Sequence, residues 1–130
     1  MEHATAQQGF PREARLIRAR DFEQVLKHPD LRLRAGPLRL NVVFNRMHCA
    51  RLGLVVGKKA VARASARNRI KRVVRDRFRR ERYRMAAMDL VVRVVGPIQR
   101  TDLHRLLDRL FAELHQKAGQ REAIESRVNH

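Results

Sequence analysis

The sequence has few of the residues that build stacking or thiol-based sites. It contains no tryptophan, one tyrosine and five phenylalanines, too few for a surface that stacks many bases. The single Cys49 cannot form a disulfide within the chain. Only His48 lies beside Cys49, and adjacent residues seldom form a working catalytic pair, so we interpret this cysteine as an ordinary small residue.

Long apolar runs are also missing. No stretch approaches the roughly 20 apolar residues that span a bilayer, so we expect no membrane association. The start, Met1-Glu2-His3-Ala4, lacks the charged-then-apolar layout of a secretory signal. Together with the lone cysteine, this predicts a cytoplasmic location. The 130 residues suffice for one domain, and an apolar content of 44% excludes a wholly disordered basic tail.

Catalytic and metal-binding motifs are absent as well. The sequence has no GxSxG, HExxH or phosphate-loop pattern, and its acidic residues are scattered singly, which argues against a two-metal nuclease site. His104 and Asp108 are spaced i,i+4 near Asp102, but catalytic metal sites usually draw ligands from several elements. We therefore interpret this group as a solvated face. We expect no catalytic residue, no bound metal and no small-molecule cofactor in the protein itself.

Acidic residues are scarce where basic residues are dense. The chain has 30 Lys and Arg against 13 Asp and Glu, a net charge of +17 and a pI of about 11.8. Thirteen of those cations lie between Lys58 and Arg84, with only Asp76 and Glu81 as acidic residues among them. A solvated helix face usually carries both signs, whereas such self-repulsion suits a surface that a polyanion neutralises. We interpret it as an anion-binding face, as in nucleic-acid-binding domains.

That basic segment has the pattern of an amphipathic helix extending to about Met85, with Ser65 as a candidate N-cap. Its apolar side carries Ala66, Ile70, Val73, Val74 and Phe78. The opposite side forms a cationic ridge, flanked by Arg67 and Lys71 on one edge and Arg69 and Arg80 on the other, with Asn68, Arg72, Arg75 and Arg79 at its centre. Arg77 falls on the apolar side, where its stem can follow the core edge while its head reaches water.

The remaining chain predicts an α-β-β-α-β-α order with one layer of helices against one sheet. A helix is expected over 19–27, with the apolar stripe Phe22, Val25 and Leu26, followed by a strand over 31–44 that Gly36-Pro37 interrupts. Residues 51–57 would form an antiparallel hairpin with it, and 89–95 a central strand reached by a parallel crossover, right-handed by the usual rule. A last helix would begin with Thr101 as N-cap. We expect residues 1–9 to be disordered and 116–130 to be a polar, frayed tail around a domain over 10–115.

RNA is a better partner than a specific DNA site. The sequence has no helix-turn-helix spacing, no zinc finger and no heptad zipper behind the basic helix. Phosphate contacts should dominate because aromatic residues are few, and the planar guanidinium fork of arginine suits phosphate oxygens.

The basic segment resembles the signature of the bacterial ribonuclease P protein family. The resemblance rests on Lys58-Lys59, a short connector, and then Arg67-Asn68-Arg69-Ile70-Lys71-Arg72. Supporting matches are Phe10-Pro11-Arg12-Glu13 with Leu16, Asp21-Phe22 with Val25, Arg51-Leu52-Gly53-Leu54, and Met88-Asp89. The likeness runs from about Phe10 to His115 and is greatest to members from Gram-negative bacteria.

The resemblance implies a fold and a function. The fold would be an α+β sandwich like a ribosomal-protein domain (ribosomal protein S5 domain 2-like), with a left-handed crossover that conflicts with our right-handed default. The partner RNA would be the catalyst and would hold Mg²⁺, while the protein would assist removal of the 5′ leader from precursor tRNA. The catalytic RNA would be bound by Lys58, Lys59, Arg67, Asn68, Arg69, Lys71, Arg72, Arg75 and Arg79.

A cleft between the first helix and the sheet would grip the 5′ leader, with Phe22, Leu26, Arg39, Asn41 and Arg51 as candidate residues. Two positions depart from the family pattern: Leu26 replaces a second aromatic, and Asn41 or a neighbour replaces a first-strand tyrosine. Phe22 equally suits a plain core residue, because its i+3 and i+4 partners are apolar. Two rival functions stay open at this point, a ribosome-associated or general RNA chaperone and a self-sufficient nuclease.

Overall fold

A four-stranded sheet with helices on both faces forms the centre of the molecule. The computed structural model describes residues 15, 18–45 and 49–128. The expected matches at Phe10 to Glu13 and at Leu16, the expected disorder of residues 1–9, and His48 lie outside these ranges. The elements are α2 (Ala19–Lys27), β1 (Leu31–Ala35), β2 (Leu38–Phe44), β3 (Arg51–Val56), α3 (Ala64–Glu81), the 3-10 turn η2 (Arg82–Arg84), β4 (Met88–Val94) and α4 (Arg100–Val128).

The predicted strand over 31–44 is two strands rather than one. Ala35 pairs with Leu38, so Gly36 and Pro37 form a two-residue hairpin turn between the antiparallel strands β1 and β2. Gly36 has a φ of 55°, as the first central position of such a turn favours, and an added Cβ there would lie 3.1 Å from a methyl carbon of Leu106. The order is therefore α-β-β-β-α-β-α, with one more strand than predicted.

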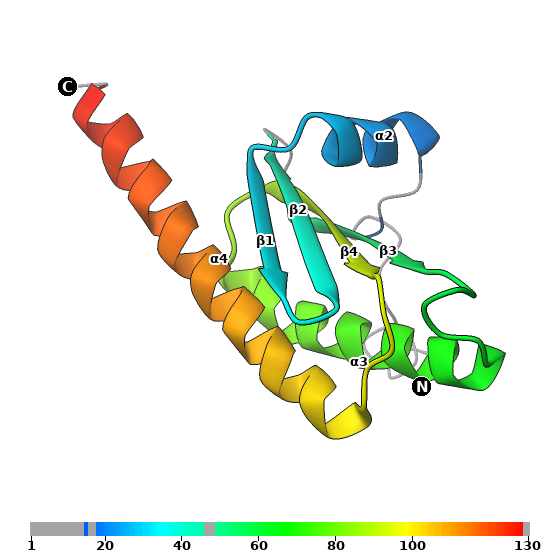
Figure 1. The fold of residues 1–130 in the computed structure, drawn as a ribbon. Helices are drawn as coiled ribbons and strands as arrows, with labels where there is room; N and C mark the ends of the chain where they lie inside the picture. Colours follow the sequence, from blue (N-terminus) through cyan, green and yellow to red (C-terminus); the bar gives the residue numbers. More distant parts are fainter. Residues whose placement is uncertain (1–14, 16–17, 46–48, 129–130) are drawn as a thin grey trace, which may run out of the picture.

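The predicted hairpin between β2 and β3 is also wrong. The sheet order is β1-β2-β4-β3, so β4 lies between the two strands that were expected to pair (Figure 1). β4 is antiparallel to β2 and parallel to β3. The predicted central position of β4 and its parallel crossover from β3 through α3 are both confirmed. All but one residue of β4 are buried, as expected of a central strand that is covered on both faces.

Helices cover both faces of the sheet, whereas one layer had been expected. On one face, α3 and α4 pack against the strands in the main core, where Phe78, Phe111 and Leu114 are almost fully buried. On the other face, α2 packs over one end of the sheet through Val25, which contacts Val91 of β4. α2 leaves the other end of that face uncovered by any described helix (Figure 1).

Helix ends differ from the predictions by small amounts, except at the C-terminus. α3 begins at Ala64 with Arg63 as its N-cap, so Ser65 lies inside the first turn, and α4 begins at Arg100, so Thr101 does too. α4 continues through Gly119 to Val128, where a frayed tail had been expected. Ala118 is still buried against the core at that point, and strong helix formers follow Gly119, which offsets the roughly 1 kcal/mol that glycine costs in a helix.

Candidate nucleic-acid interface

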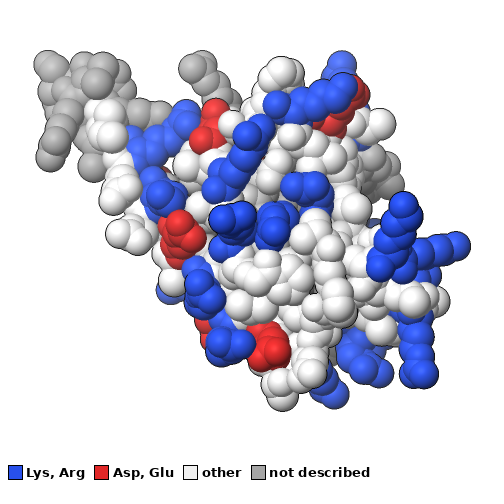
Figure 2. All heavy atoms as spheres, viewed as in Figure 1, with Lys and Arg blue, Asp and Glu red and all other residues white. Residues whose placement is uncertain are grey.

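The exposed side of α3 and the connector before it form a continuous cationic surface. Lys58 and Lys59 are exposed in the turn after β3, and Asn68, Arg69, Arg72 and Arg75 are exposed along α3. Lys71 is half-buried beside them. Figure 2 shows Lys and Arg side chains projecting from the N-terminal end of α3, at the right of the view. Within the described residues, neither Lys71, Arg69, Arg72 nor Arg75 has an ion pair. These cations are available to a ligand.

Arg67 differs from the other predicted contacts because its side chain holds the connector. Its Nη1 donates hydrogen bonds to the carbonyl oxygens of Val61 (3.0 Å) and Ala62 (2.8 Å). The side chain is half-buried and satisfies backbone acceptors that precede the helix. Arg67 therefore positions the connector that carries Lys58 and Lys59 into the cationic surface.

The C-terminal part of α3 is paired internally, which the sequence analysis had not expected. Arg79 donates from Nη2 to Asp76 at 2.5 Å, and Arg80 lies 3.3 Å from the same carboxylate. Of the predicted RNA-binding residues, Arg79 thus already has an acidic neighbour. The cationic ridge is partly neutralised at this end of the helix.

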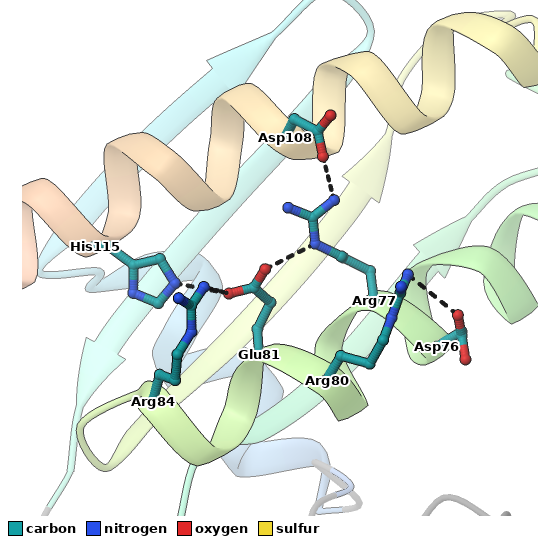
Figure 3. Close-up of polar contacts among 7 residues, drawn as sticks. All are labelled: Asp76, Arg77, Arg80, Glu81, Arg84, Asp108 and His115. Atoms are coloured by element: carbon teal, nitrogen blue, oxygen red, sulfur yellow. Dashed lines mark hydrogen bonds and ion pairs between the residues drawn. The ribbon is translucent and has the colours of Figure 1, made fainter.

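A buried carboxylate joins this end of α3 to α4 (Figure 3). Glu81 accepts hydrogen bonds from Arg77 Nε and Arg84 Nη2 and contacts His115 Nε2, each at 2.8 Å. Burial raises the pKa of the Glu81 carboxyl, but the hydrogen bonds from Arg84, His115 and Arg77 outweigh it and lower the pKa to about 2. Glu81 is therefore ionised and holds the guanidinium groups of Arg77 and Arg84 close together.

Arg77 lies on the apolar side of α3 because it has a structural role there. Its guanidinium hydrogen-bonds Asp108 of α4 as well as Glu81, and its Cζ lies 5.5 Å from the centre of the Phe111 ring. Asp108, which the sequence analysis placed on a solvated face, is exposed yet forms this pair. No group of three or more His, Cys, Asp or Glu among the described residues is arranged to hold a metal ion.

The structure brings the predicted cleft residues to one face of the sheet, but most of them make internal contacts. Phe22 of α2 lies directly over Gly53 of β3, where an added Cβ would be only 2.4 Å from the ring. Asn41 is buried and donates from Nδ2 to the carbonyl oxygen of Val25 at 3.3 Å, which fixes the end of α2 to β2. Leu26 is half-buried next to this contact. Phe22 thus packs on the sheet while staying partly exposed.

Arg51 is held by carboxylates rather than facing a ligand freely. Its Nε and Nη2 donate to the two oxygens of Asp89 at 2.8 and 2.7 Å, and its Nη1 lies 3.6 Å from Asp21 of α2. The hydrogen bonds to Asp89 raise the pKa of Arg51 against the opposing effect of burial. This bidentate pair makes Arg51 a link between β3, β4 and α2.

A row of arginines crosses the part of the sheet that α2 leaves open. Strand register places Arg34 of β1 opposite Arg39 of β2, and Arg39 opposite Arg93 of β4. Figure 2 shows Lys and Arg side chains gathered across this face. Like charges opposite each other destabilise a sheet, and the buried Nε of Arg93 has no hydrogen-bond partner. Such a row suits an anionic strand lying over the sheet.

Sequence reasoning found only one member of this row. Arg39 was predicted, and its Nη1 also donates to the carbonyl oxygens of Gly36 (2.7 Å) and Leu38 (3.1 Å) at the hairpin turn. Arg34 and Arg93 were missed because the row depends on which strands are neighbours. The alternating pattern of β1 and β4 places Arg34 and Arg93 on the less apolar face of each strand. The predicted pairing of β2 with β3, however, kept β4 and therefore Arg93 away from Arg39.

The fold and the cationic surface are those of a small, basic α+β protein suited to binding an anion. Comparisons with known proteins place this protein in a family. The family model described as Ribonuclease P matches residues 10–118. The ribonuclease P protein component of Chromohalobacter salexigens is 37% identical, over 82% of this chain and 86% of the relative. That of Edwardsiella ictaluri is also 37% identical, over 92% of this chain and 96% of the relative.

Solved structures show the same fold. The RNase P protein of Staphylococcus aureus superposes with a TM-score of 0.71 at 23% identity, over 78% of this chain and 94% of that structure. The RNase P protein of Thermotoga maritima, in complex with 1-(4-fluorophenyl)-2-thiourea, gives a TM-score of 0.57 at 29% identity, over 73% and 83%. The chain therefore belongs to the ribonuclease P protein component family. The family implies a part in tRNA processing, as one component of an endoribonuclease.

No described helix is long and apolar enough to cross a membrane.

Proposed function

We propose that this chain is the accessory protein of a ribonucleoprotein endonuclease whose RNA subunit carries out the chemistry. The chain would bind the catalytic RNA and the 5′ leader of precursor tRNA, and so assist cleavage that leaves the mature tRNA 5′ end. The observation that carries the proposal is the surface of α3 and its connector, where several exposed cations have no acidic partner among the residues that the structure describes. Bringing two RNA molecules together requires neutralisation of phosphates, which such a surface supplies.

The chemistry of phosphodiester hydrolysis would belong to Mg²⁺ held by the RNA subunit, where the metal activates water. Four of the protein's carboxylates are held in pairs with arginine. Asp89 and Glu81 are buried in arginine pairs, and Asp76 and Asp108 also pair with arginines. This side-chain arrangement supports a role in binding and charge neutralisation rather than in proton transfer.

The two cationic surfaces suit two different RNAs. The exposed side of α3 would contact the catalytic RNA through Arg69, Lys71, Arg72 and Arg75. The arginine row of Arg34, Arg39 and Arg93 would bind the backbone of the single-stranded leader, beside the partly exposed ring of Phe22. One aromatic ring allows at most limited base stacking, so leader binding would depend mainly on phosphate contacts and tolerate different sequences.

The test is cleavage of precursor tRNA by protein alone, by RNA subunit alone and by both together. At low Mg²⁺ concentration we expect cleavage only with both, because the protein lowers repulsion between the two RNAs. Arg93→Ala should reduce the affinity for precursor with a leader severalfold and leave the affinity for leaderless tRNA unchanged. Cleavage by RNA-free protein would contradict the proposal, and so would a pair of subunits no more active than the RNA alone.

A further inference from the structure

A small groove lies beside the cationic surface. Its volume is about 260 Å³, and it lies where the connector, the N-terminal part of α3 and the start of α4 meet. The floor is apolar, formed by Ala66, Ile70 and Val73 of α3, Leu103 of α4, and Ile98. Typical small-molecule sites have about 300–1,000 Å³, so this groove suits one flat ring system, such as a nucleobase, rather than a drug-sized ligand.

The rim of the groove carries positive charge only. Arg63, Arg69 and Arg100 line it together with apolar residues, and none of the described lining residues is acidic. All three arginines are exposed and form no ion pair with any residue that the structure describes. An apolar floor under three unpaired guanidinium groups fits a ligand with a flat apolar body and a negatively charged group attached to it.

Two of these arginines occupy positions that a helix disfavours. Arg63 is the N-cap of α3, and Arg100 is the first residue of α4. Both helix N-termini carry partial positive charge, where acidic residues are preferred, and α3 has no acidic residue in its first turn. Local conflicts of this kind are expected at functional sites, and an anion at the rim would relieve this one.

We propose that this groove accepts one unstacked nucleotide of the RNA partner, with the base on the apolar floor and its phosphate among Arg63, Arg69 and Arg100. The inference rests on the proposed function and names a specific contact within it. The groove is continuous with the exposed face of α3 through Arg69, so an RNA bound along that face passes its edge. An inserted base would fix the register of the RNA on the protein, which phosphate contacts alone do not do.

The first test uses the full chain without RNA and follows backbone amide NMR signals during titration. The probes are AMP and UMP, with ribose 5-phosphate, inorganic phosphate and decanoate as competitors of different chemistry. We expect AMP and UMP to shift the signals of Ala66, Ile70 and Leu103 at concentrations at least about tenfold lower than ribose 5-phosphate or phosphate. Equal binding of ribose 5-phosphate, or tighter binding of decanoate, would overturn the assignment to a nucleotide.

The second test fills the groove without changing its charge. Ala66→Leu keeps a strong helix former in α3, and Ala62→Leu reaches the groove from the exposed connector in case the first variant folds poorly. Ala112→Leu, on an exposed position of α4 outside the groove, is the matched control. We expect both groove variants to lose AMP binding and to bind the RNA subunit about tenfold more weakly, with an unchanged salt dependence.

Groove variants that bind AMP and the RNA subunit as the control does would overturn this inference and leave the proposed function intact. Failure of the proposed function would look different, because the wild-type chain would then give no added cleavage with the RNA subunit.

Discussion

The two halves of α3 use the same residue type for opposite purposes. In the first half, Arg69 and Arg72, and Arg75 just beyond it, are exposed and have no acidic neighbour within hydrogen-bonding reach among the described residues. In the second half, Arg80 lies beside Asp76, and Glu81 is held between Arg77 and Arg84 of the following turn η2. An arginine that pairs with an acidic residue is thus committed to the fold. Arg72 also lies four residues from Asp76, but that carboxylate pairs with Arg79 and Arg80, which leaves Arg72 for a ligand.

The comparison predicts that mutations in the paired half lower the stability of the fold, whereas mutations in the unpaired half lower the affinity for RNA. In the paired half, Glu81→Gln should lower the free energy of unfolding by about 2–3 kcal/mol, because Arg77 loses a buried carboxylate that it shares with His115. Urea denaturation of the purified chain measures this. Glu122→Gln, at an exposed position of α4, should change stability by less than about 0.5 kcal/mol. A Glu81 variant as stable as this control would show that the cluster does not hold α3 to α4.

The same cluster predicts a pH dependence of stability. Because the folded-state pKa of Glu81 is lowered from 4.5 to about 2, its contribution is fully present above pH 4.5 and is lost as the pH falls through 2. The loss should be on the order of 2 kcal/mol, since Arg84 is largely exposed and solvent screens its share. Denaturation at pH 7, 5, 4 and 3 should therefore show wild type and Glu81→Gln converging. A constant difference between them would contradict the lowered pKa.

The patterns within single elements were readable from the sequence, whereas the relations between elements were not. The periodicity of Ile70, Val74 and Phe78 identified the buried side of α3, and β-branched residues identified β4 as central. Which strands flank β4 depends on long-range pairing, which local patterns do not encode, so the predicted hairpin was wrong. The strand count was wrong for a local reason, because Gly36-Pro37 was interpreted as an interruption of one strand and not as a two-residue hairpin turn. The arginine row was missed for the same reason.

The hydrogen-bond partners of individual side chains could not be predicted from the sequence either. The sequence lists Arg51, Arg67 and Arg79 beside Arg72 with no sign that they differ. The structure shows that the first three contact Asp89, the connector carbonyls and Asp76, respectively. Glu81 was noted only as a rare acidic residue, although its spacing of four from Arg77 and three from Arg84 was a signal for the cluster.

The most direct test of the account compares arginine removal in the two halves of α3. Arg72→Ala and Arg80→Ala remove the same charge from one helix, and the affinity of each variant for the RNA subunit is measured over a range of salt concentrations. We expect Arg72→Ala to weaken binding about tenfold at low salt and to reduce the slope of log K against log salt by about one, because one phosphate contact is lost. Arg80→Ala should change that slope by less than half as much. Equal losses for both variants would contradict the claim that the unpaired half of α3 is the RNA-binding surface.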